Sequence, residues 1–338
     1  MLSSSEVESI SSRFDFDRFA DKRILITGAS GLVGGYLVDA ILKCTDHMGI
    51  KAPTIIAISK SGKFSSLRDQ VDNSRLITQS LDLEHQKIDF EYELLIHAAS
   101  TASPTKQVSR ETLLNVNCNT LRNLYKKPGS VERVLFISTG EVYGAQAPRH
   151  VSEDYIGIID RSNYRADYPD AKLRAEKLTL ELSKLGIEGR IARLFHSYGP
   201  GVRIDDGRSF ADFLWAASHG QPPTLRTSGS QIRSFLYLED TIVGLLKILD
   251  SDFSTPVNLG SEVEVSILDF AKAVSEVAGF GGKVNFENIK SNTIFSPNDI
   301  VLPNVSKLRN IGWSQEISIH LGIERTLNWI AGSKLAKE

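Results

Sequence analysis

Short, nearly uninterrupted apolar runs alternate along this chain with longer stretches in which apolar residues recur every three or four positions. Such runs are typical of strands buried on both faces of a sheet, and the longer stretches are typical of amphipathic helices. Strands that alternate with helices predict an α/β fold with a parallel, doubly wound sheet and right-handed crossovers. The predicted strands are 24–26, 53–59, 76–83, 94–97 and 134–137, and the predicted helices are 32–42, 108–125, 168–182, 209–218, a segment ending at 249, 267–277 and 317–329.

The first 21 residues do not follow this alternation. They mix serine and glutamate with Phe14, Phe16 and Phe19. We expect a mobile tip followed by an aromatic segment packed against the sheet domain, and we assign the region no chemistry.

Glycines follow the first predicted strand directly, at Gly28, Gly31 and Gly34, and a helical pattern begins among them. Glycine lets the chain turn sharply, approach a pyrophosphate closely and pack a helix against a strand, while the helix N-terminus offers N–H donors. An ordinary glycine turn is the alternative, but the strand before it and the helix after it favour a dinucleotide site. The residues expected to bind the dinucleotide at this turn are Gly28, Ser30, Gly31, Leu32 and Val33.

The second predicted strand ends in Ser59, which is followed by Lys60. Dinucleotide folds commonly carry an acidic residue here, where it holds the ribose hydroxyls of the adenosine. That acid is missing. A lysine is suited to a 2′-phosphate, so the cofactor is NADP or, if Lys60 lies in a solvated loop, NAD held by other contacts. After the third strand, Asp82 reaches the adenine amine or caps the next turn, and Leu83 is expected to line the same site.

Small residues, Ala98, Ala99 and Ser100, follow the fourth predicted strand. Their size lets the backbone lie against the ribose and nicotinamide of a dinucleotide. In the helical pattern that comes next, Asn117 faces inward. We therefore expect these four residues to line the cofactor site.

Hydroxyl and carboxylate groups gather just after the fifth predicted strand, in Thr139 and Glu141. Open α/β sheets bind ligands at the carboxyl ends of their strands. Further on, Tyr168 and Lys172 stand four residues apart in a helical pattern and so lie on one face. An ammonium lowers the pKa of a neighbouring phenol, which gives a base for a sugar hydroxyl while hydride leaves the same carbon. A surface pair is the alternative, which the upstream glycine turn and Thr139 disfavour.

Composition narrows the class of protein without indicating a site. With 338 residues, of which 41% are hydrophobic and 24% charged, the chain can bury one large core or two modest ones. The 39 basic and 41 acidic side chains nearly cancel, so we expect no nucleic acid partner. Cys44 and Cys118 are too few for a disulfide framework, and no apolar run reaches the length of a membrane span. We expect a cytoplasmic protein without membrane contact or a metal site.

Beyond Gly201 the pattern becomes irregular, which predicts a second domain. Arg233 lies there, and the planar fork of its guanidinium is suited to the paired oxygens of a diphosphate, although a surface arginine is the alternative. Asp240 is expected to cap the helix that ends at 249. The predicted division is a dinucleotide-binding domain of residues 15–200, completed by 236–262, and a substrate domain of residues 201–235 and 263–335.

Together these motifs resemble those of the extended short-chain dehydrogenases/reductases, in the branch of nucleotide-sugar epimerases and dehydratases. The resemblance covers residues 22–330. It is carried by Thr-Gly-Ala-Ser-Gly-Leu-Val-Gly at 27–34, His-Ala-Ala at 97–99, Asn117, Ser-Thr-Gly-Glu-Val-Tyr-Gly at 138–144, Tyr168 with Lys172, and Arg-Leu-Phe-His-Ser-Tyr-Gly-Pro at 193–200. It implies a Rossmann sheet with a smaller α/β substrate domain, NAD or NADP as cofactor, a nucleotide-sugar substrate and a homodimer.

The resemblance also implies roles for single residues. Tyr168 is expected to be the base, Lys172 its electrostatic partner and a contact of the nicotinamide ribose, and Thr139 the hydroxyl that hydrogen-bonds the reacting sugar oxygen. Asn117 and Arg233 are expected to organise the site and the nucleotide diphosphate. The residues expected to bind the substrate are Ser100, Thr139, Gly140, His196, Ser197, Arg203 and Arg233, and Glu141 is expected to join the catalytic set.

Two departures bear on the reaction, although segments 100–104, 152–155 and 205–208 are most similar to the UDP-glucuronate decarboxylases. The residue before Glu141 is aspartate in the dTDP-glucose 4,6-dehydratases and usually serine in the decarboxylases, but here it is Gly140, which leaves no obvious acid for a departing C6 hydroxyl. The decarboxylases carry an arginine two residues before a late proline, where this chain has Val301. We therefore expect chemistry confined mainly to sugar C4, in a 4-epimerase or a 4-keto-sugar reductase. A decarboxylase or dehydratase, and a catalytically silent cofactor-binding protein, are the alternatives.

Overall fold

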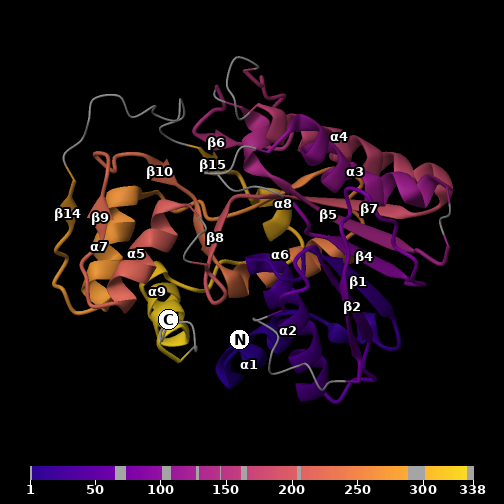
Figure 1. The fold of residues 1–338 in the computed structure, drawn as a ribbon, viewed down its shortest axis with the longest axis horizontal. Coiled ribbons are helices and arrows are strands. Elements are labelled where there is room, and N and C mark those ends of the chain that lie inside the picture. Colours follow the sequence, from indigo (N-terminus) through magenta and orange to yellow (C-terminus); the bar gives the residue numbers. More distant parts are fainter. Residues whose placement is uncertain are drawn as a thin grey trace.

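A parallel sheet of seven strands, in the order β12-β7-β5-β4-β1-β2-β3, forms the centre of the molecule (Figure 1). The computed structural model describes residues 2–64, 74–100, 108–126, 129–144, 146–160, 166–203, 207–287 and 301–332. The sheet confirms the predicted α/β fold. Its strands are β1 (Arg23–Thr27), β2 (Thr54–Ser59), β3 (Leu76–Ser80), β4 (Leu94–His97), β5 (Arg133–Thr139), β7 (Glu188–Leu194) and β12 (Val257–Leu259).

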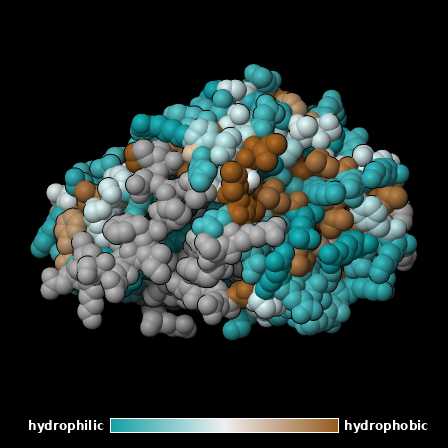
Figure 2. Space-filling model, turned by 90° about the horizontal axis from the view of Figure 1, so that it is seen from above, coloured by the Kyte–Doolittle hydropathy of each residue, from teal (hydrophilic) through white to brown (hydrophobic). Residues whose placement is uncertain are grey.

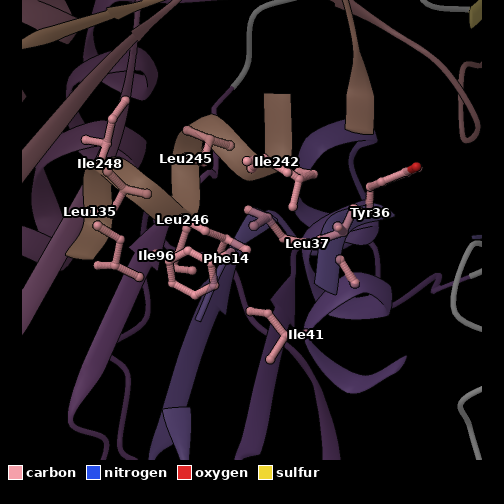
Figure 3. Packing of buried hydrophobic residues seen from close by; sticks show 14 of the residues in the cluster. Phe14, Tyr36, Leu37, Ile41, Ile96, Leu135, Ile242, Leu245, Leu246 and Ile248 are labelled. Carbon is pink, nitrogen blue, oxygen red and sulfur yellow. The ribbon is translucent and has the colours of Figure 1, made fainter. Parts of the chain in front are cut away.

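The apolar runs form strands because helices cover both faces of the sheet. In β1, Ile24 and Ile26 are buried in one core, whereas Leu25 is buried in another on the opposite face. Complete burial of such a side chain stabilises the fold by about 1.5–3 kcal/mol. The first face is covered by α2 (Leu32–His47) and α6 (Leu238–Asp250), and the other by α3 (Arg110–Lys126), α4 (Asp167–Glu181) and the short 3-10 helix η4 (Leu182–Leu185). In the first core, Leu37 and Ile41 of α2 lie opposite Ile242, Leu245 and Leu246 of α6 (Figure 3).

A second, smaller core lies beside the sheet and is built on α5 (Ser209–Ser218), α7 (Ile267–Val277) and α9 (Ile319–Gly332) (Figure 1). The strand β11 (Phe235–Tyr237), which pairs in parallel with β8 (His196–Tyr198), joins the two cores: Leu236 packs in the first, whereas Phe235 and Tyr237 pack in the second. The predicted domain boundaries stay a prediction. The remaining elements are β6 (His150–Val151), β9 (Thr224–Leu225), β10 (Ile232–Arg233), β13 (Val265–Ser266), β14 (Asn285–Phe286), β15 (Leu302–Pro303) and α8 (Ser306–Arg309).

The N-terminal residues form a helix, so the expected mobile tip was wrong. Helix α1 (Ser4–Arg13) begins with a capping box, in which Ser3 accepts from the main chain of Glu6 and the Glu6 carboxylate accepts from the main chain of Ser3. The three phenylalanines that follow, one of them before and two within the 3-10 helix η1 (Phe16–Phe19), are buried in the first core. The prediction of a packed aromatic segment is therefore confirmed.

The surface mixes polar and apolar residues. Seen from above, one face carries hydrophobic residues grouped near its middle, with hydrophilic residues around them (Figure 2). The large hydrophobic side chains exposed on the described surface are Met48, Ile156, Ile158, Leu185, Val263, Phe286 and Leu321. Both cysteines are buried free thiols. Among the described residues, no helix combines the length and the apolar character that a membrane crossing requires.

Candidate active site

The turn between β1 and α2 brings main-chain segments unusually close together. Gly28 has a φ of 70°, and a Cβ on it would lie 2.7 Å from the main-chain nitrogen of Ala99. A Cβ on Gly34 would lie 2.4 Å from the carbonyl oxygen of Gly28. Gly31 is the N-cap of α2, and none of the described side chains caps that helix end. The first N–H groups of α2, at Leu32 and Val33, thus face the turn as donors for an anion.

A chain of hydroxyls and an ion pair stand where the adenosine half of a dinucleotide is expected. The Ser30 and Ser59 hydroxyl oxygens are 2.5 Å apart. The Lys60 ammonium lies 2.8 Å from a carboxylate oxygen of Asp82, and the hydrogen bond between them raises the pKa of Lys60 and lowers that of Asp82. Asp82 also accepts from the main chain of Glu84, so it does cap the next turn. Its contact with adenine stays a prediction.

His97 ties the cofactor turn to the helix behind it. Its Nε2–H donates to the main-chain oxygen of Asn117 at 3.1 Å, because a carbonyl can only accept, and this leaves Nδ1 to accept from the Thr27 hydroxyl at 2.6 Å. The Thr27 oxygen accepts in turn from the main chain of Ala99. Burial, followed by the nearby charge of Lys172, lowers the pKa of His97 to about 3. A neutral imidazole therefore fixes the position of the Ala98–Ala99 segment.

Two buried polar atoms on α3 have no hydrogen-bond partner among the described residues. They are the side-chain oxygens of Asn117 and Thr120, which lie about one helical turn apart. The Asn117 amide nitrogen donates to the main chain of Leu113. Unpartnered buried acceptors are costly unless a ligand or water serves them. Together with the close main-chain approach at Gly28 and the open end of α2, they fit a dinucleotide.

The expected base and its hydroxyl neighbour come together at the end of β5. Tyr168 lies in the first turn of α4, and the Thr139 hydroxyl lies beside its phenol. Burial, then the charge of Glu141, raises the pKa of Tyr168 above its usual range, whereas Thr139, Ser100 and the charge of Arg208 oppose that rise. Thr139 also caps η3 (Gly140–Tyr143) by accepting from the main chain of Glu141, whose side chain is exposed.

Lys172 is buried beneath this pair. Its ammonium donates to the main-chain oxygen of Ile137 at 2.7 Å and lies 6.0 Å from the centre of the Tyr168 ring. It also lies 4.7 Å from the centre of the Phe136 ring. Burial lowers the pKa of Lys172 to about 7, and the charge of Glu176 opposes that shift. The predicted pairing of Tyr168 and Lys172 on one helix face is present, with the charge held under the ring.

Sequence reasoning missed the polar network that supports the site. Glu176 follows Lys172 by one turn and forms a buried ion pair with Arg193 at 2.8 Å, while the Ser138 hydroxyl donates to the same carboxylate. The Arg193 guanidinium lies 4.9 Å from the centre of the Tyr143 ring. The i, i+4 spacing of Lys172 and Glu176, and the place of Arg193 in the 193–200 motif, were the available signals.

The residue after Thr139 is closely covered. A Cβ on Gly140 would lie 2.8 Å from two atoms of the Phe195 ring. Phe195 and Val301 both pack against an apolar cluster centred on Val142, Tyr143 and Val151. Val301, at the place where the decarboxylases have an arginine, is therefore part of an apolar wall.

The residues expected to bind substrate lie on several elements: Ser100 follows β4, Thr139 and Gly140 lie at the end of β5, His196 and Ser197 lie in β8, Arg203 follows β8 and Arg233 lies in β10. Arg233 is half-buried and donates to the main chain of Ile232, and His196 lies 6.0 Å from the Phe235 ring. The Ser197 hydroxyl is buried against Thr241, and Arg203 is exposed. Sequence reasoning did not select Arg208, which precedes α5 and whose charge acts on Tyr168.

Asp240 does not cap its own helix, so that prediction was wrong. Its carboxylate accepts from Arg13 and from the main chains of Glu316 and Ile317, just before α9. The N-cap of α6 is Tyr237 instead. An acidic residue near the start of a helical pattern was a misleading signal here, because the Asp240 oxygens accept hydrogen bonds from residues distant in the sequence.

Comparison with known proteins agrees with this arrangement. A model of the NAD dependent epimerase/dehydratase family matches residues 24–260. UDP-glucuronic acid decarboxylase 1 of Xenopus tropicalis is 31% identical over 316 residues, which are 91% of this chain and 72% of the relative. UDP-glucuronic acid decarboxylase 6 of Arabidopsis thaliana is 30% identical over 90% of this chain and 87% of its own.

Solved structures show the same fold. UDP-N-acetylglucosamine 4-epimerase of Methanobrevibacter ruminantium superposes with a TM-score of 0.78 at 19% identity, over 93% of this chain and 99% of that one. UDP-glucuronic acid 4-epimerase of Bacillus cereus, in complex with UDP-glucuronic acid and NAD, gives a TM-score of 0.75 at 23% identity, over 92% and 99% of the two chains.

Proposed function

The chain belongs to the NAD-dependent epimerase/dehydratase family of enzymes, and on this basis we propose that it is a UDP-sugar 4-epimerase. The juxtaposition of Tyr168, Thr139 and buried Lys172 at the end of β5 supports chemistry at a sugar carbinol. The Phe195 ring lies over Gly140, where a dehydratase would need an acid, and this supports a reaction in which only C4 is oxidised and reduced. The choice of uridine follows from the names of the decarboxylases that the chain resembles.

Tyr168 is the group that takes the proton. As an epimerase, the site would move the proton of the C4 hydroxyl to the Tyr168 oxygen, in its phenolate form, while the C4 hydride would pass to a bound NAD, which gives a 4-keto sugar. The Thr139 hydroxyl hydrogen-bonds the sugar oxygen and aligns it for this transfer. After the keto sugar presents its other face, the hydride returns and Tyr168 gives the proton back. No atom is lost or gained.

A bound NAD supplies reversible hydride acceptance and a positive nicotinamide charge. The residues around Tyr168 would prepare its phenol to act as a base when NAD is bound. In the chain alone, burial raises the Tyr168 pKa, so the phenol is neutral, and a cation beside it favours the phenolate. Lys172 would contribute that charge from below the ring, held in place by the Ile137 carbonyl. Gly28, Gly31 and the N–H groups of Leu32 and Val33 would hold the pyrophosphate, and Asn117 would present its free acceptor.

The apolar wall argues against an added step at C5 or C6. A dehydratase needs an acid that protonates a departing hydroxyl, and a side chain at position 140 would meet the Phe195 ring unless the ring moved. Val301 offers no charge for a carboxylate. These two features favour an epimerase over the enzymes that eliminate water or carbon dioxide.

NAD is the better supported cofactor of the two considered. The family is NAD dependent, and Lys60 already has a carboxylate partner in Asp82 at 2.8 Å. A 2′-phosphate would have to compete with Asp82 for this charge. A 4-keto-sugar reductase that exchanges NADPH is accordingly less favoured.

UDP-glucuronate decarboxylation is the second candidate, because the relatives at 30 and 31% identity carry that name. The two reactions share the C4 oxidation by Tyr168 and differ afterwards. A decarboxylase would release carbon dioxide from the 4-keto glucuronate by breaking the C5–C6 bond, place a proton on C5 and then return the hydride to C4.

One assay separates these outcomes. The purified protein is incubated with UDP-glucose, UDP-N-acetylglucosamine and UDP-glucuronic acid labelled with deuterium at C4, and products are analysed by mass spectrometry and chromatography. An epimerase gives a separated isomer of unchanged mass that keeps the deuterium, without added NADH. Loss of carbon dioxide would establish the second candidate. If none of the three sugars is converted, a parallel incubation with a 4-keto sugar and added NAD(P)H tests for a reductase, which would consume the reduced cofactor. Tyr168→Phe serves as the inactive control.

A further inference from the structure

A single buried carboxylate on the N-terminal helix α1 accepts hydrogen bonds from tyrosines of two different cores. One oxygen of Glu6 accepts from the Tyr36 hydroxyl at 2.9 Å and from the Tyr237 hydroxyl at 2.7 Å. Its other oxygen accepts from the main chain and the hydroxyl of Ser3. Glu6 is 3% exposed, so its charge is compensated by these four donors rather than by water.

The two tyrosines belong to the two sides of the site. Tyr36 lies in the second turn of α2, whose first turn faces the cofactor turn, and its hydroxyl points away from the apolar residues of the first core (Figure 3). Tyr237 ends β11 and packs in the second core, four residues after Arg233. Leu32, the first residue of α2, packs against both cores. The start of α2 therefore lies at the junction that Glu6 spans.

Further polar contacts fix α1 in this position. Arg13, at its C-terminal end, forms an ion pair with Asp240 of α6 at 2.7 Å, and Ser9 donates to Glu239 of the same helix. Glu239 also pairs with Arg325 of α9. Helix α1 thus contacts elements of both cores, and in the fold it lies beside α2, on the side where α9 ends (Figure 1). It precedes the residues 24–260 that match the family.

We propose that Glu6 is a positioning residue that holds the cofactor helix α2 in a fixed position relative to β11. A change on the substrate side therefore alters cofactor affinity through this carboxylate. The inference rests on the proposed function in one respect, which is that the second core, with Tyr237, is taken as the substrate side. Energetic coupling between two sites needs an element that contacts both, and its effect is reciprocal. Because Glu6 touches neither ligand site directly, its loss should act through the placement of α2 and β11.

A double-mutant cycle on NADH affinity tests this. NADH is titrated by fluorescence against the full chain after exchange of any copurified nucleotide. We expect Glu6→Leu to weaken NADH binding about fivefold or more, and Tyr237→Phe to weaken it about threefold although Tyr237 is on the substrate side. Adding Tyr237→Phe to Glu6→Leu should cause no further loss, because the acceptor for the phenol is already gone.

Matched variants separate positioning from general stability. Glu6→Gln keeps an acceptor oxygen and should stay within about twofold of the parent chain, as should Glu8→Leu, which changes an exposed residue of the same helix. The proposal is overturned if Tyr237→Phe leaves NADH affinity unchanged, or if the affinity losses of Glu6→Leu and Tyr237→Phe multiply in the double variant. A fall in melting temperature without these affinity effects does not support it.

Two outcomes that resemble failure remain informative. If Glu6→Leu does not fold, Tyr36→Phe and Tyr237→Phe complete the same cycle with Glu6 intact: non-multiplicative losses support the proposal and independent losses overturn it. If the parent chain converts no nucleotide sugar, the proposed function fails, but the NADH cycle still tests Glu6.

Discussion

The Phe195 ring occupies the space into which a side chain on Gly140 would project, since a Cβ there would lie 2.8 Å from two ring atoms. Contacts on several sides surround Phe195. Its main-chain N–H donates to Leu259, its ring lies 6.3 Å from that of Tyr143, and a Cβ on Gly260 would already meet the Phe195 Cβ at 2.9 Å. The absence of an acid beside Thr139 is thus matched by the packing around it.

Gly140→Ala should therefore lower turnover although it adds only a methyl group. Overpacking of a filled site costs about 1–3 kcal/mol, and a loss of that size in the transition state lowers kcat by about fivefold to 150-fold. The measurement is steady-state kinetics on the substrate found by the product assay. Shortening the obstructing ring in Gly140→Ala/Phe195→Ala should restore part of the loss relative to Phe195→Ala alone.

Gly332→Ala is the matched control for this substitution. Gly332 is the last residue of α9, is exposed, and a Cβ on it would meet no atom within 4 Å. Its turnover should equal that of the parent chain. Full activity in Gly140→Ala would show that the ring yields, and the packing argument against a side chain at position 140 would be lost.

Tyr168→Phe should remove the base while leaving the cofactor site nearly intact. Loss of a general base lowers turnover by about 100- to 10,000-fold. Tyr125→Phe makes the same change at a phenol that only donates to the main chain of Leu178, and it should keep nearly normal kcat. Both variants are compared by kcat and by NADH affinity. Near-normal kcat in Tyr168→Phe would falsify the assignment.

Local signals sufficed to predict the first strand, the glycine turn and the helix face that Tyr168 shares with Lys172. The apolar run 24–26 and the glycines after it fix a strand and a turn whatever lies around them, and the i, i+4 spacing of Tyr168 and Lys172 places both on one helix face. Each of these expectations is met by the fold. They depend on residues that are near in sequence.

The contacts that were missed join residues far apart in the chain. Nothing near Asp240 reveals that Arg13 and the main chain of Ile317 take its oxygens, or that Glu6 meets Tyr237, 231 residues away. The same holds for Gly140 and Phe195, whose proximity follows from the pairing of β5 with β7. The capping box of Ser3 and Glu6 was the exception, because its four-residue pattern did carry the signal of a helix start.

Asp82→Asn should shift the preference of the enzyme toward NADP. The substitution removes the nearer of two carboxylates at Lys60, since Glu84 lies 3.9 Å away, and so makes the exposed ammonium more available to a 2′-phosphate. An exposed ion pair is worth about 0–1 kcal/mol, so the ratio of NADP to NAD affinity should rise by up to about fivefold. Because both cofactors carry adenine, this ratio cancels any effect of Asp82 on the base. Binding titrations with both cofactors measure it.

The double variant Asp82→Asn/Lys60→Ala should return the ratio to that of the parent chain. Lys63→Ala, which changes an exposed lysine of the same loop, should leave the ratio alone. A shift that survives in the double variant would mean that Lys60 does not meet the phosphate.

His97→Gln should flatten the loss of stability in acid. In the fold the pKa of His97 is lowered to about 3, chiefly by burial, whereas in the unfolded chain it is about 6.5. Between these values the unfolded chain binds the extra proton, so the free energy of unfolding falls as pH falls, by about 1.4 kcal/mol per pH unit from this group. Above pH 6.5 the contribution is fully present.

Urea denaturation at a series of pH values should give a shallower decline for His97→Gln, despite lower stability at neutral pH from the lost bonds to Thr27 and Asn117. His47→Gln, at an exposed position in the last turn of α2, should keep the parent slope. Equal slopes for His97→Gln and the parent chain would mean that His97 is protonated in the fold and that its Nδ1 does not accept from Thr27.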